Sequence, residues 1–342
     1  MAKSIATVWP TIAGAKQRDL RRPVRRLLGA ARRGTAGLLR PGTPEVGGPT
    51  LDGHGRGAGS GVALLARPQT AMPPHILQHG MLEAVSRQES RAVYIGEQTL
   101  LCRVLGKYLM YADAQETGIT PHLAMDGYWE SWITIALARM LRPGWHCLDV
   151  GANHGYYTLI MADAVGPEGR VVPVEPTPRL ADLLRQTLDV NGFPGVDVAS
   201  TAATDTDGER LQLVIPARRS MNARLAQVAG PTDVAVEVET VTVDTLTRDW
   251  PRVDLIKIDV EGAEESVWRG MQRTIEQNPD LVVILELNVE RYEDPRGFLE
   301  AIESAGFQLR YIDFDAEVKG VTIDRLLRRR VGEDWMLYLA RR

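Results

Sequence analysis

The chain has 342 residues, of which 44% are hydrophobic, so it can bury a full core in one large domain or two smaller ones. Residues 1–40 hold ten Lys or Arg and one acid, which leaves a net charge of about −13 on the rest of the chain. An acidic body argues against nucleic acid as a partner, because that binding needs clustered basic side chains. The two cysteines, Cys102 and Cys147, form neither a zinc-binding spacing nor a disulfide framework, so we expect a reducing, cytoplasmic location.

Residues 1–61 are expected to form a head and linker outside the folded domain. The segment "RRPVRRLLGAARRGTAGLLR" predicts either a disordered basic tail or a helix that makes weak contact with anionic membrane. Residues 41–61 contain too many Gly and Pro for a helix or strand, which is typical of a flexible linker. No apolar run approaches the roughly 20 residues that a membrane-spanning helix needs.

Residues 62–119 predict a small N-terminal cap. We expect a helix over 75–90, followed by short strands in "RAVYIG" and "LLCRVLGKYLMYAD". The next segment, "YWESWITIALARMLRP", has apolar residues at helical spacing and ends at a Pro-Gly pair.

Residues 120–342 show the alternation of strands and helices that is typical of an α/β fold. Strands are predicted at 147–150, 170–174, 196–200, 254–260, 281–287, 307–313 and 334–340, with helices at 156–164, 178–191, 263–277 and 295–305. This predicts a seven-stranded mixed sheet with helices on both faces. No strong helix separates the last two strands, so we expect the last strand to be antiparallel, in a hairpin at the sheet edge.

An insertion separates the third and fourth predicted strands. Its pieces "DTDGERLQLVI", "RRSMNARLAQ" and "VEVETVTVDTL" predict an extra β ribbon and a loop over the carboxyl edge of the sheet. Open sheets of this class bind their ligands at that edge.

The first strand of the sheet leads into a glycine turn, "CLDVGANHGYYT". Dinucleotide sites use G-x-G-x-x-G at this point, whereas this turn has only Gly151 and Gly155, with Asn153 between them. Two glycines still permit a close backbone approach to a ligand that has an adenosine but no phosphate, and S-adenosyl-L-methionine is such a ligand. Asp149 then offers a carboxylate to the cationic amino group of its methionine end.

Glu175 ends the next strand, about 20 residues beyond the turn. At this distance a carboxylate can accept hydrogen bonds from both ribose hydroxyls. For the adenine ring, the loop after the third strand offers Ala203 or Asp205, although its D-x-D-G-E sequence also suits a hairpin turn.

These motifs resemble those of the FkbM family of S-adenosylmethionine-dependent methyltransferases. The resemblance rests on "LDVGANHGYYT", "VVPVEPTPRL", "VDTL" and above all "DLIKIDVEGAEESVWRG", and it covers roughly residues 120–315. It implies the class I methyltransferase fold, which is Rossmann-like, and methyl transfer to an oxygen, commonly a sugar or polyketide hydroxyl. The sequence departs from the family at "VVPVEP", where members often carry an aromatic residue before the Glu.

A sugar hydroxyl is a weak acid, so its methylation is helped by a base or a metal ion. Asp259 and Glu261 follow the fourth strand, and would share one face with Lys257 if the strand continued; Glu286 ends the next strand. The three carboxylates predict either a base whose pKa is raised by crowding or a divalent cation site. Lys257 is expected to pair its ammonium with a carboxylate.

Other residues at this edge have competing interpretations. His154 is a second candidate base, or a loop residue that bonds to its neighbours' backbone. Glu261 is alternatively a residue that favours the next helix N-terminus. The segment before the core that contains Tyr128, Trp129, Glu130 and Trp132 either covers the cofactor or holds the acceptor, or its aromatic residues belong to the core.

The predicted function is therefore O-methylation of a small-molecule or carbohydrate acceptor. Two alternatives stay open: a nicotinamide-dependent oxidoreductase and a non-catalytic binding protein that retains the fold. The first lacks the third glycine and an evident Tyr-x-x-x-Lys pair.

Overall fold

The computed structural model of the protein describes residues 74–226, 229–328 and 334–341. The predicted basic head and linker, residues 1–61, lie outside this part, together with the membrane contact predicted for the head. None of the described helices has the length and apolar character needed to cross a membrane.

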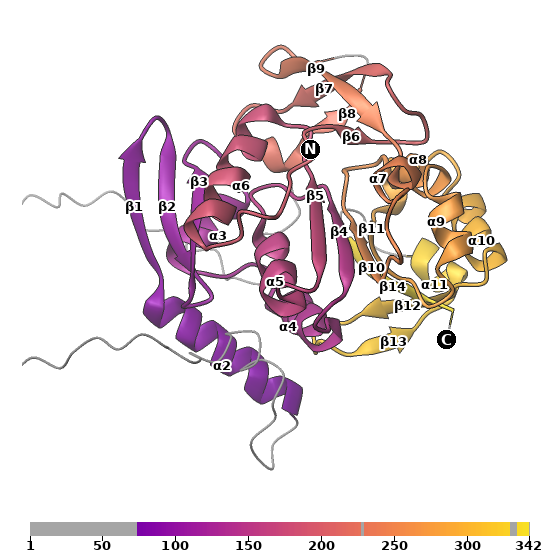
Figure 1. Ribbon diagram of the computed structural model, residues 1–342, viewed down its shortest axis with the longest axis horizontal. Coiled ribbons are helices and arrows are strands. Elements are labelled where there is room, and N and C mark those ends of the chain that lie inside the picture. The colour runs from indigo at the N-terminus through magenta and orange to yellow at the C-terminus, as the bar shows by residue number, and fades with distance from the viewer. Residues whose placement is uncertain (1–73, 227–228, 329–333, 342) are drawn as a thin grey trace, which may run out of the picture. The chain divides into compact units, whose positions relative to one another are not determined.

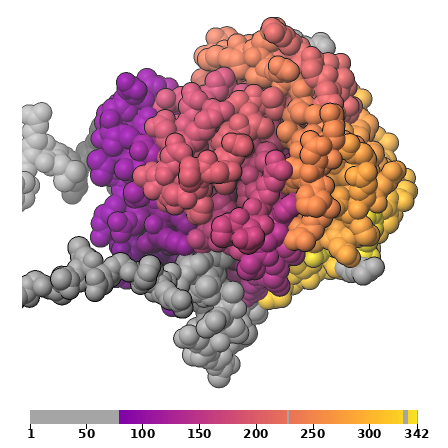
Figure 2. Space-filling model, viewed as in Figure 1, coloured from indigo at the N-terminus to yellow at the C-terminus, as the bar shows by residue number. Residues whose placement is uncertain are grey.

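An antiparallel three-stranded sheet stands at the start of the described chain. It follows α2 (Pro74–Glu89) and consists of β1 (Arg91–Gly96), β2 (Thr99–Val104) and β3 (Tyr108–Asp113). This confirms the predicted helix and the strand pairing after it. The sheet is fastened to α6 (Pro178–Val190), where Thr187 Oγ1 accepts a hydrogen bond from the backbone N–H of Tyr111 at 3.0 Å. In Figure 2 the indigo start of the described chain and the magenta part that follows it form one continuous surface.

A seven-stranded mixed sheet forms the centre of the fold (Figure 1), in the order β13-β12-β14-β11-β10-β4-β5. In chain order its strands are β4 (His146–Val150), β5 (Arg170–Val174), β10 (Leu255–Ile258), β11 (Val282–Leu287), β12 (Gln308–Ile312), β13 (Val318–Gly320) and β14 (Trp335–Ala340). Strands β5, β4, β10 and β11 run parallel. The predicted class of sheet and its strand count are confirmed.

The last strand is antiparallel, as predicted, but its position differs from the expected edge hairpin. β14 lies between β11 and β12 and pairs antiparallel with both, while β13 forms the edge hairpin with β12. The reason is its apolar sequence, "WMLYLA", in which Leu337 and Leu339 are buried on one face and Met336 and Ala340 on the other. A strand that is apolar on both faces is more stable inside a sheet than at its edge.

The strand predicted at 196–200 does not form. Only an isolated bridge joins Val174 to Ala199. The carbonyl of Pro173 accepts a hydrogen bond from the N–H of Ala199, but Pro173 has no N–H to return. The ladder outside β5 therefore stops after one bridge, and the count of seven is completed by β13.

Helices cover both faces of the central sheet. One face packs against α4 (Ser131–Met140), α5 (Tyr156–Val165) and α6, with α3 (Ile119–Met125) beside them. The other packs against α8 (Glu264–Arg269), α9 (Gln272–Gln277), α10 (Pro295–Ser304) and α11 (Ile323–Leu327). The helix predicted at 263–277 is interrupted at Gly270, where a Cβ atom would lie 2.1 Å from the carbonyl oxygen of Thr204.

The predicted insertion folds as a small sheet with a loop. Its strands are β6 (Ala202–Ala203), β7 (Arg210–Ile215), β8 (Arg224–Leu225) and β9 (Val234–Val241), in the order β6-β9-β7-β8. The 3₁₀ turn Ser220–Asn222 precedes β8, and the short helix α7 (Val243–Leu246) follows β9. The extra β ribbon is thus confirmed.

Candidate active site

A pocket opens at the carboxyl edge of the parallel strands. Residues that end β4, β5, β10 and β11 line it, together with parts of the insertion and of the segment before α4. Of the residues predicted for the site, the lining contains Trp129, Gly151, Asn153, His154, Glu175, Asp259, Glu261 and Glu286. It does not contain Tyr128, Asp149, Gly155 or Asp205.

The turn after β4 forms the floor of the pocket. Gly151 has φ +80°, and a Cβ atom there would lie 1.9 Å from the carbonyl oxygen of Asp259. Gly155 has φ +87°, and a Cβ atom would meet Leu184 at 2.1 Å. Only glycine lets this turn pack so closely against β10 and α6.

Glu175 connects the ends of β4 and β5. Its Oε2 accepts from the backbone N–H of Asn153 and its Oε1 from that of Thr177, each at 2.8 Å. The side chain is only 4% exposed, and this burial raises its pKa. A carboxylate accepts about four hydrogen bonds, so two acceptor positions remain for a ligand.

Asp149 lies beneath the pocket and not on its lining. It is 1% exposed, its Oδ2 accepts from Thr158 Oγ1 at 2.6 Å, and its Oδ1 has no hydrogen-bond partner among the described residues. Burial raises its pKa, while the nearby ammonium of Lys257 lowers it. Asp149 therefore lies outside the pocket lining, and its contact with a cofactor amino group stays a prediction.

Lys257 is a buried cation between two acids. Its Nζ lies 2.9 Å from Asp259 Oδ2 and 4.9 Å from the ring centroid of Tyr157. Burial lowers its pKa, but Asp259 and Asp149 together raise it above the ordinary lysine value. The predicted pairing of this lysine with a carboxylate is present.

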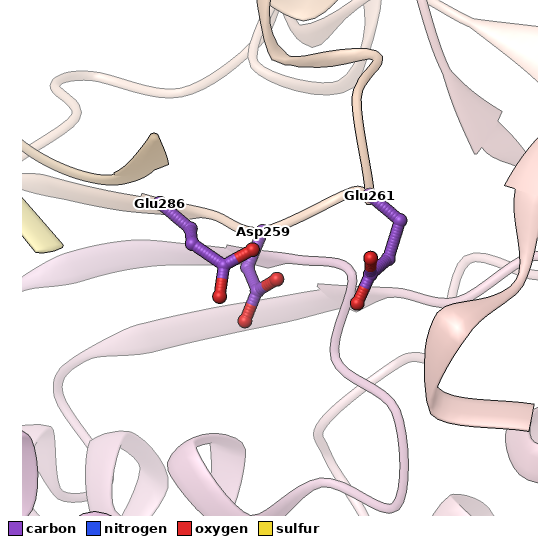
Figure 3. Close-up of side chains that lie close together, drawn as sticks. All are labelled: Asp259, Glu261 and Glu286. Carbon is purple, nitrogen blue, oxygen red and sulfur yellow. The ribbon is translucent and has the colours of Figure 1, made fainter. Parts of the chain in front are cut away.

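Asp259, Glu261 and Glu286 converge at the pocket. One oxygen of each carboxylate lies within 4.8 Å of one oxygen of the other two, and Figure 3 shows the side chains pointing the same way. The expected continuation of the strand is wrong, since β10 ends at Ile258 and Glu261 has φ +57°. A left-handed turn, and not strand alternation, brings Glu261 to the group.

Arg291 holds two of these carboxylates together. Its Nη2 lies 2.7 Å from Glu261 Oε2, and its Nη1 lies 2.7 Å from Glu286 Oε2. Burial is the main cause that raises the pKa of Glu261 to about 7 and the pKa of Glu286 well above its ordinary value. Asp259 raises both further, so crowding contributes as predicted but ranks below burial.

His154 has no free nitrogen with which to act as a base. Its Nε2 accepts from the backbone N–H of Asp113 at 3.0 Å, and its Nδ1 bonds to Asn153 Oδ1 at 2.5 Å. It is fully buried, and burial lowers its pKa to about 4. The alternative interpretation, a loop residue that bonds to its neighbours, describes this histidine better.

Residues 149–309 match the family model of the methyltransferase FkbM domain. We refer to this matched segment as the FkbM domain. The match contains the glycine turn, Glu175 and the three converging carboxylates. Methyltransferases of this family depend on S-adenosylmethionine, so the cofactor predicted from the glycine turn is that of the family.

The chain is also similar to other methyltransferases over shorter stretches. It is 46% identical over 52 residues to the protein-L-isoaspartate O-methyltransferase of Methanopyrus kandleri, which covers 15% of this chain and 23% of that protein. The enzyme of the same name from Triticum aestivum is 55% identical over 68 residues, 20% of this chain and 26% of that protein. The matched segments thus span about a quarter of these curated relatives.

A solved O-methyltransferase from Bacillus cereus, in complex with SAH, has a TM-score of 0.34 and 14% identity to this chain. The alignment covers 62% of this chain and 78% of that one. This likeness is too distant to inform the site of the FkbM domain.

Two predicted residues have structural partners outside the pocket of the FkbM domain. Asp205 forms an ion pair with Arg269 at 2.9 Å and fastens its loop to α8. Ala203, the other residue predicted near the adenine, does line the pocket. The hydroxyl of Tyr128 accepts a hydrogen bond from Arg87.

Several functional candidates in and beside the FkbM domain were missed from the sequence, or, like Glu130, were named there only as part of a segment that could cover the cofactor or hold the acceptor. Glu130 and Tyr157 line the pocket and share a hydrogen bond of 2.6 Å. Glu264 accepts from the N–H groups of Val260 and Gly262, so it stabilises the turn before α8, a role weighed for Glu261. Glu264 could have been found from its position, because acids are common in the first turn of a helix. No sequence pattern predicts that Arg291 pairs with Glu261 and Glu286.

The insertion covers the pocket of the FkbM domain from above, as predicted. Met221 and Arg224 line it, and Asn222 Nδ2 donates to Glu261 Oε1 at 3.3 Å. The hydroxyl of Thr117 donates to the carbonyl of Arg218 at 2.8 Å, which ties this loop to the segment before α3.

Proposed function

We propose that the FkbM domain transfers a methyl group from S-adenosylmethionine to a hydroxyl oxygen of a sugar or a glycosylated metabolite. The observation that carries the proposal is the convergence of Asp259, Glu261 and Glu286 beside the glycine turn. Carboxylates accept hydrogen bonds from hydroxyl groups, and a carboxylate of this pocket can take up the proton that an O-methylation releases.

The residues at the turn fit the cofactor. Glu175 has two acceptor positions left for ribose hydroxyls, and Gly151 allows a ligand to approach the backbone closely. Ala202 and Ala203 line the pocket with small apolar surface that suits an adenine ring. When bound, S-adenosylmethionine supplies an electrophilic methyl group on a sulfonium.

The acceptor side of the pocket combines acids with an aromatic ring. Trp129 offers an apolar face of the kind that packs against a sugar ring, while the three carboxylates accept from its hydroxyl groups. A small-molecule or carbohydrate acceptor fits this chemistry better than a nucleic acid, whose phosphates the carboxylates would repel.

The carboxylates are already balanced by cations. Lys257 pairs with Asp259, and Arg291 pairs with Glu261 and Glu286. A divalent ion at the same oxygens would have to displace these pairs, so the proposed reaction uses the carboxylates without a metal.

Cofactor binding to the full chain tests the proposal. In titration calorimetry with EDTA present, the wild type should bind S-adenosylmethionine, and Glu175→Gln should bind it roughly 10- to 100-fold more weakly, because a charged acceptor is lost. Asp205→Asn, whose ion pair lies outside the pocket, should bind normally. Transfer of a labelled methyl group to a panel of methyl glycosides then identifies the acceptor.

Two results would contradict the proposal. Uptake of NADH without uptake of S-adenosylmethionine would favour an oxidoreductase, for which no observation so far speaks. If Asp205→Asn and Glu175→Gln lost affinity for S-adenosylmethionine equally, the ribose of the cofactor would not bind at Glu175.

A further inference from the structure

We propose that Glu130 is the general base that accepts the proton of the acceptor hydroxyl. This role rests on the methyl transfer proposed above, and it assigns the base to a residue before the FkbM match. Glu130 lies on the segment that leads into α4, and it lines the same pocket as the glycine turn and the three carboxylates.

The backbone of Glu130 is strained. Its φ of 36° and ψ of 68° are left-handed, which costs a residue with a Cβ atom about 1–2 kcal/mol. The conformation is held by Thr134, whose N–H donates to the carbonyl of Glu130 at 3.0 Å and whose hydroxyl donates to the carbonyl of Trp129 at 2.9 Å. Strain of this kind persists where the surroundings fix it, and it is concentrated at functional sites.

Glu130 differs from the three converging carboxylates in its partner. They contact the cations of Lys257 and Arg291, whereas Glu130 Oε2 accepts from the neutral hydroxyl of Tyr157 at 2.6 Å. Among the residues that the structure describes, no Lys or Arg forms an ion pair with Glu130. A contacting cation stabilises the ionised form and makes a carboxylate a weaker base.

The surroundings adjust the basicity of Glu130. Burial raises its pKa to about 7, the hydrogen bond from Tyr157 lowers it, Asp259 and Asp334 raise it, and Lys257 lowers it. Tyr156 also lies within electrostatic range of Glu130, and burial keeps both tyrosines neutral by raising their pKa values. A base whose pKa lies near neutral pH is well matched to its task.

The step balances as a single displacement. The acceptor O–H bond breaks and its proton forms a bond to a carboxylate oxygen of Glu130. The acceptor oxygen bonds to the methyl carbon, and the carbon–sulfur bond breaks with its electron pair left on sulfur. Glu130 then releases the proton to water, and S-adenosylhomocysteine leaves.

Two ligands that differ at the reacting position test this without knowledge of the acceptor. Sinefungin carries a protonated amine where the cofactor carries its methyl sulfonium, whereas S-adenosylhomocysteine is neutral there. In the full-length wild type, the ratio of sinefungin affinity to S-adenosylhomocysteine affinity should rise up to about tenfold from pH 6 to pH 8 as Glu130 ionises. Glu130→Gln should lower the ratio at pH 8 by about tenfold or more and remove the rise.

Matched variants separate Glu130 from its neighbours. Glu261→Gln should keep the rise, although Glu261 ionises in the same range, and the exposed Glu300→Gln should behave as the wild type. Tyr157→Phe removes the hydroxyl that lowers the pKa of Glu130, so the rise should move to higher pH. This second variant tests the proposal even if Glu130→Gln does not fold.

Each contrary outcome has a distinct meaning. A rise that survives in Glu130→Gln but disappears in Glu261→Gln would overturn the assignment and make Glu261 the base. A wild-type ratio that does not change with pH would also overturn it. If the wild type binds neither ligand, the proposed methyl transfer fails, and the role of Glu130 fails with it.

Discussion

The ammonium of Lys257 is buried at the pocket, where it pairs with Asp259 and also stabilises the charge of Asp149 electrostatically. A buried ion pair adds little net stability over an apolar core, but removal of one partner leaves the other charge buried without compensation. Loss of Lys257 should therefore cost far more stability than the intact ion pair adds. We expect Lys257 to be needed for folding as well as for chemistry.

Lys257→Ala should lower the free energy of unfolding by about 3–5 kcal/mol, because two acids lose their buried cation. Lys319 is a matched control, since its Nζ also contacts two carboxylates, Asp313 and Asp315, but its side chain is 41% exposed. Lys319→Ala should cost far less, because solvent screens an ion pair at the surface. Urea unfolding at pH 7 measures both, and equal losses would show that the burial of Lys257 has no energetic weight.

At the scale of elements, the turn between β4 and α5 decides the position of the site. Gly151 lets the turn contact the end of β10, so the glycine turn and Asp259 become neighbours. The turn is also held by hydrogen bonds from the N–H groups of Gly151 and Ala152 to the carbonyl of Val174. Glycine at position 151 thus allows the ends of β4, β5 and β10 to lie next to one another.

Gly151→Ala should disrupt this junction. The added Cβ would lie 1.9 Å from the backbone of Asp259, so the strands must move apart in addition to the cost of the left-handed conformation. Gly208→Ala is the control that has only the cost of the left-handed conformation, about 1–2 kcal/mol. Gly208 has φ +73°, and nothing lies within 4 Å of its Cβ position.

Chemical denaturation and cofactor calorimetry should find Gly151→Ala much less stable than Gly208→Ala and unable to bind S-adenosylmethionine. Binding that stays normal in Gly151→Ala would show that the close approach at this turn is dispensable.

At the scale of the whole molecule, buried groups give stability two opposite dependences on pH. Glu130 and Glu261 have a pKa of about 7 in the folded protein against an ordinary value of 4.5, so the folded state binds more protons between these values. Their contribution to stability is lost as pH rises through this window. His154, with a folded pKa of about 4 against 6.5, contributes stability that is lost as pH falls.

The double variant Glu130→Gln, Glu261→Gln should remove the first dependence. From pH 5 to pH 8, its free energy of unfolding should gain a few kcal/mol relative to that of the wild type, since each unit of pKa shift corresponds to about 1.4 kcal/mol. Urea unfolding at each pH measures the difference, with the double variant Glu265→Gln, Glu300→Gln as the control, since solvent reaches both of these side chains. The same pH dependence in both double variants would argue against the raised pKa values.

The local sequence accounts for most of the fold and for the cofactor side of the site. Apolar runs located β4, β5, β10, β11, β12 and β14, and the spacing from the glycine turn to Glu175 located two of the pocket's walls. Local patterns failed where a distant contact decided the outcome. Pro173 left the strand at 196–200 with a single bridge, and the contact of Gly270 with Thr204 divided a predicted helix into α8 and α9.

The amino-acid sequence by itself determined the α/β alternation, the antiparallel last strand and the gathering of acids at one edge, because these follow from periodicity and chain order. Only the tertiary structure decided the charge state and partners of those acids. Arg291 contacts Glu286 and Tyr157 contacts Glu130 across separate elements, and burial raises the pKa of both acids. Burial and pairing are properties of the folded interior, so no local pattern in the chain specifies them.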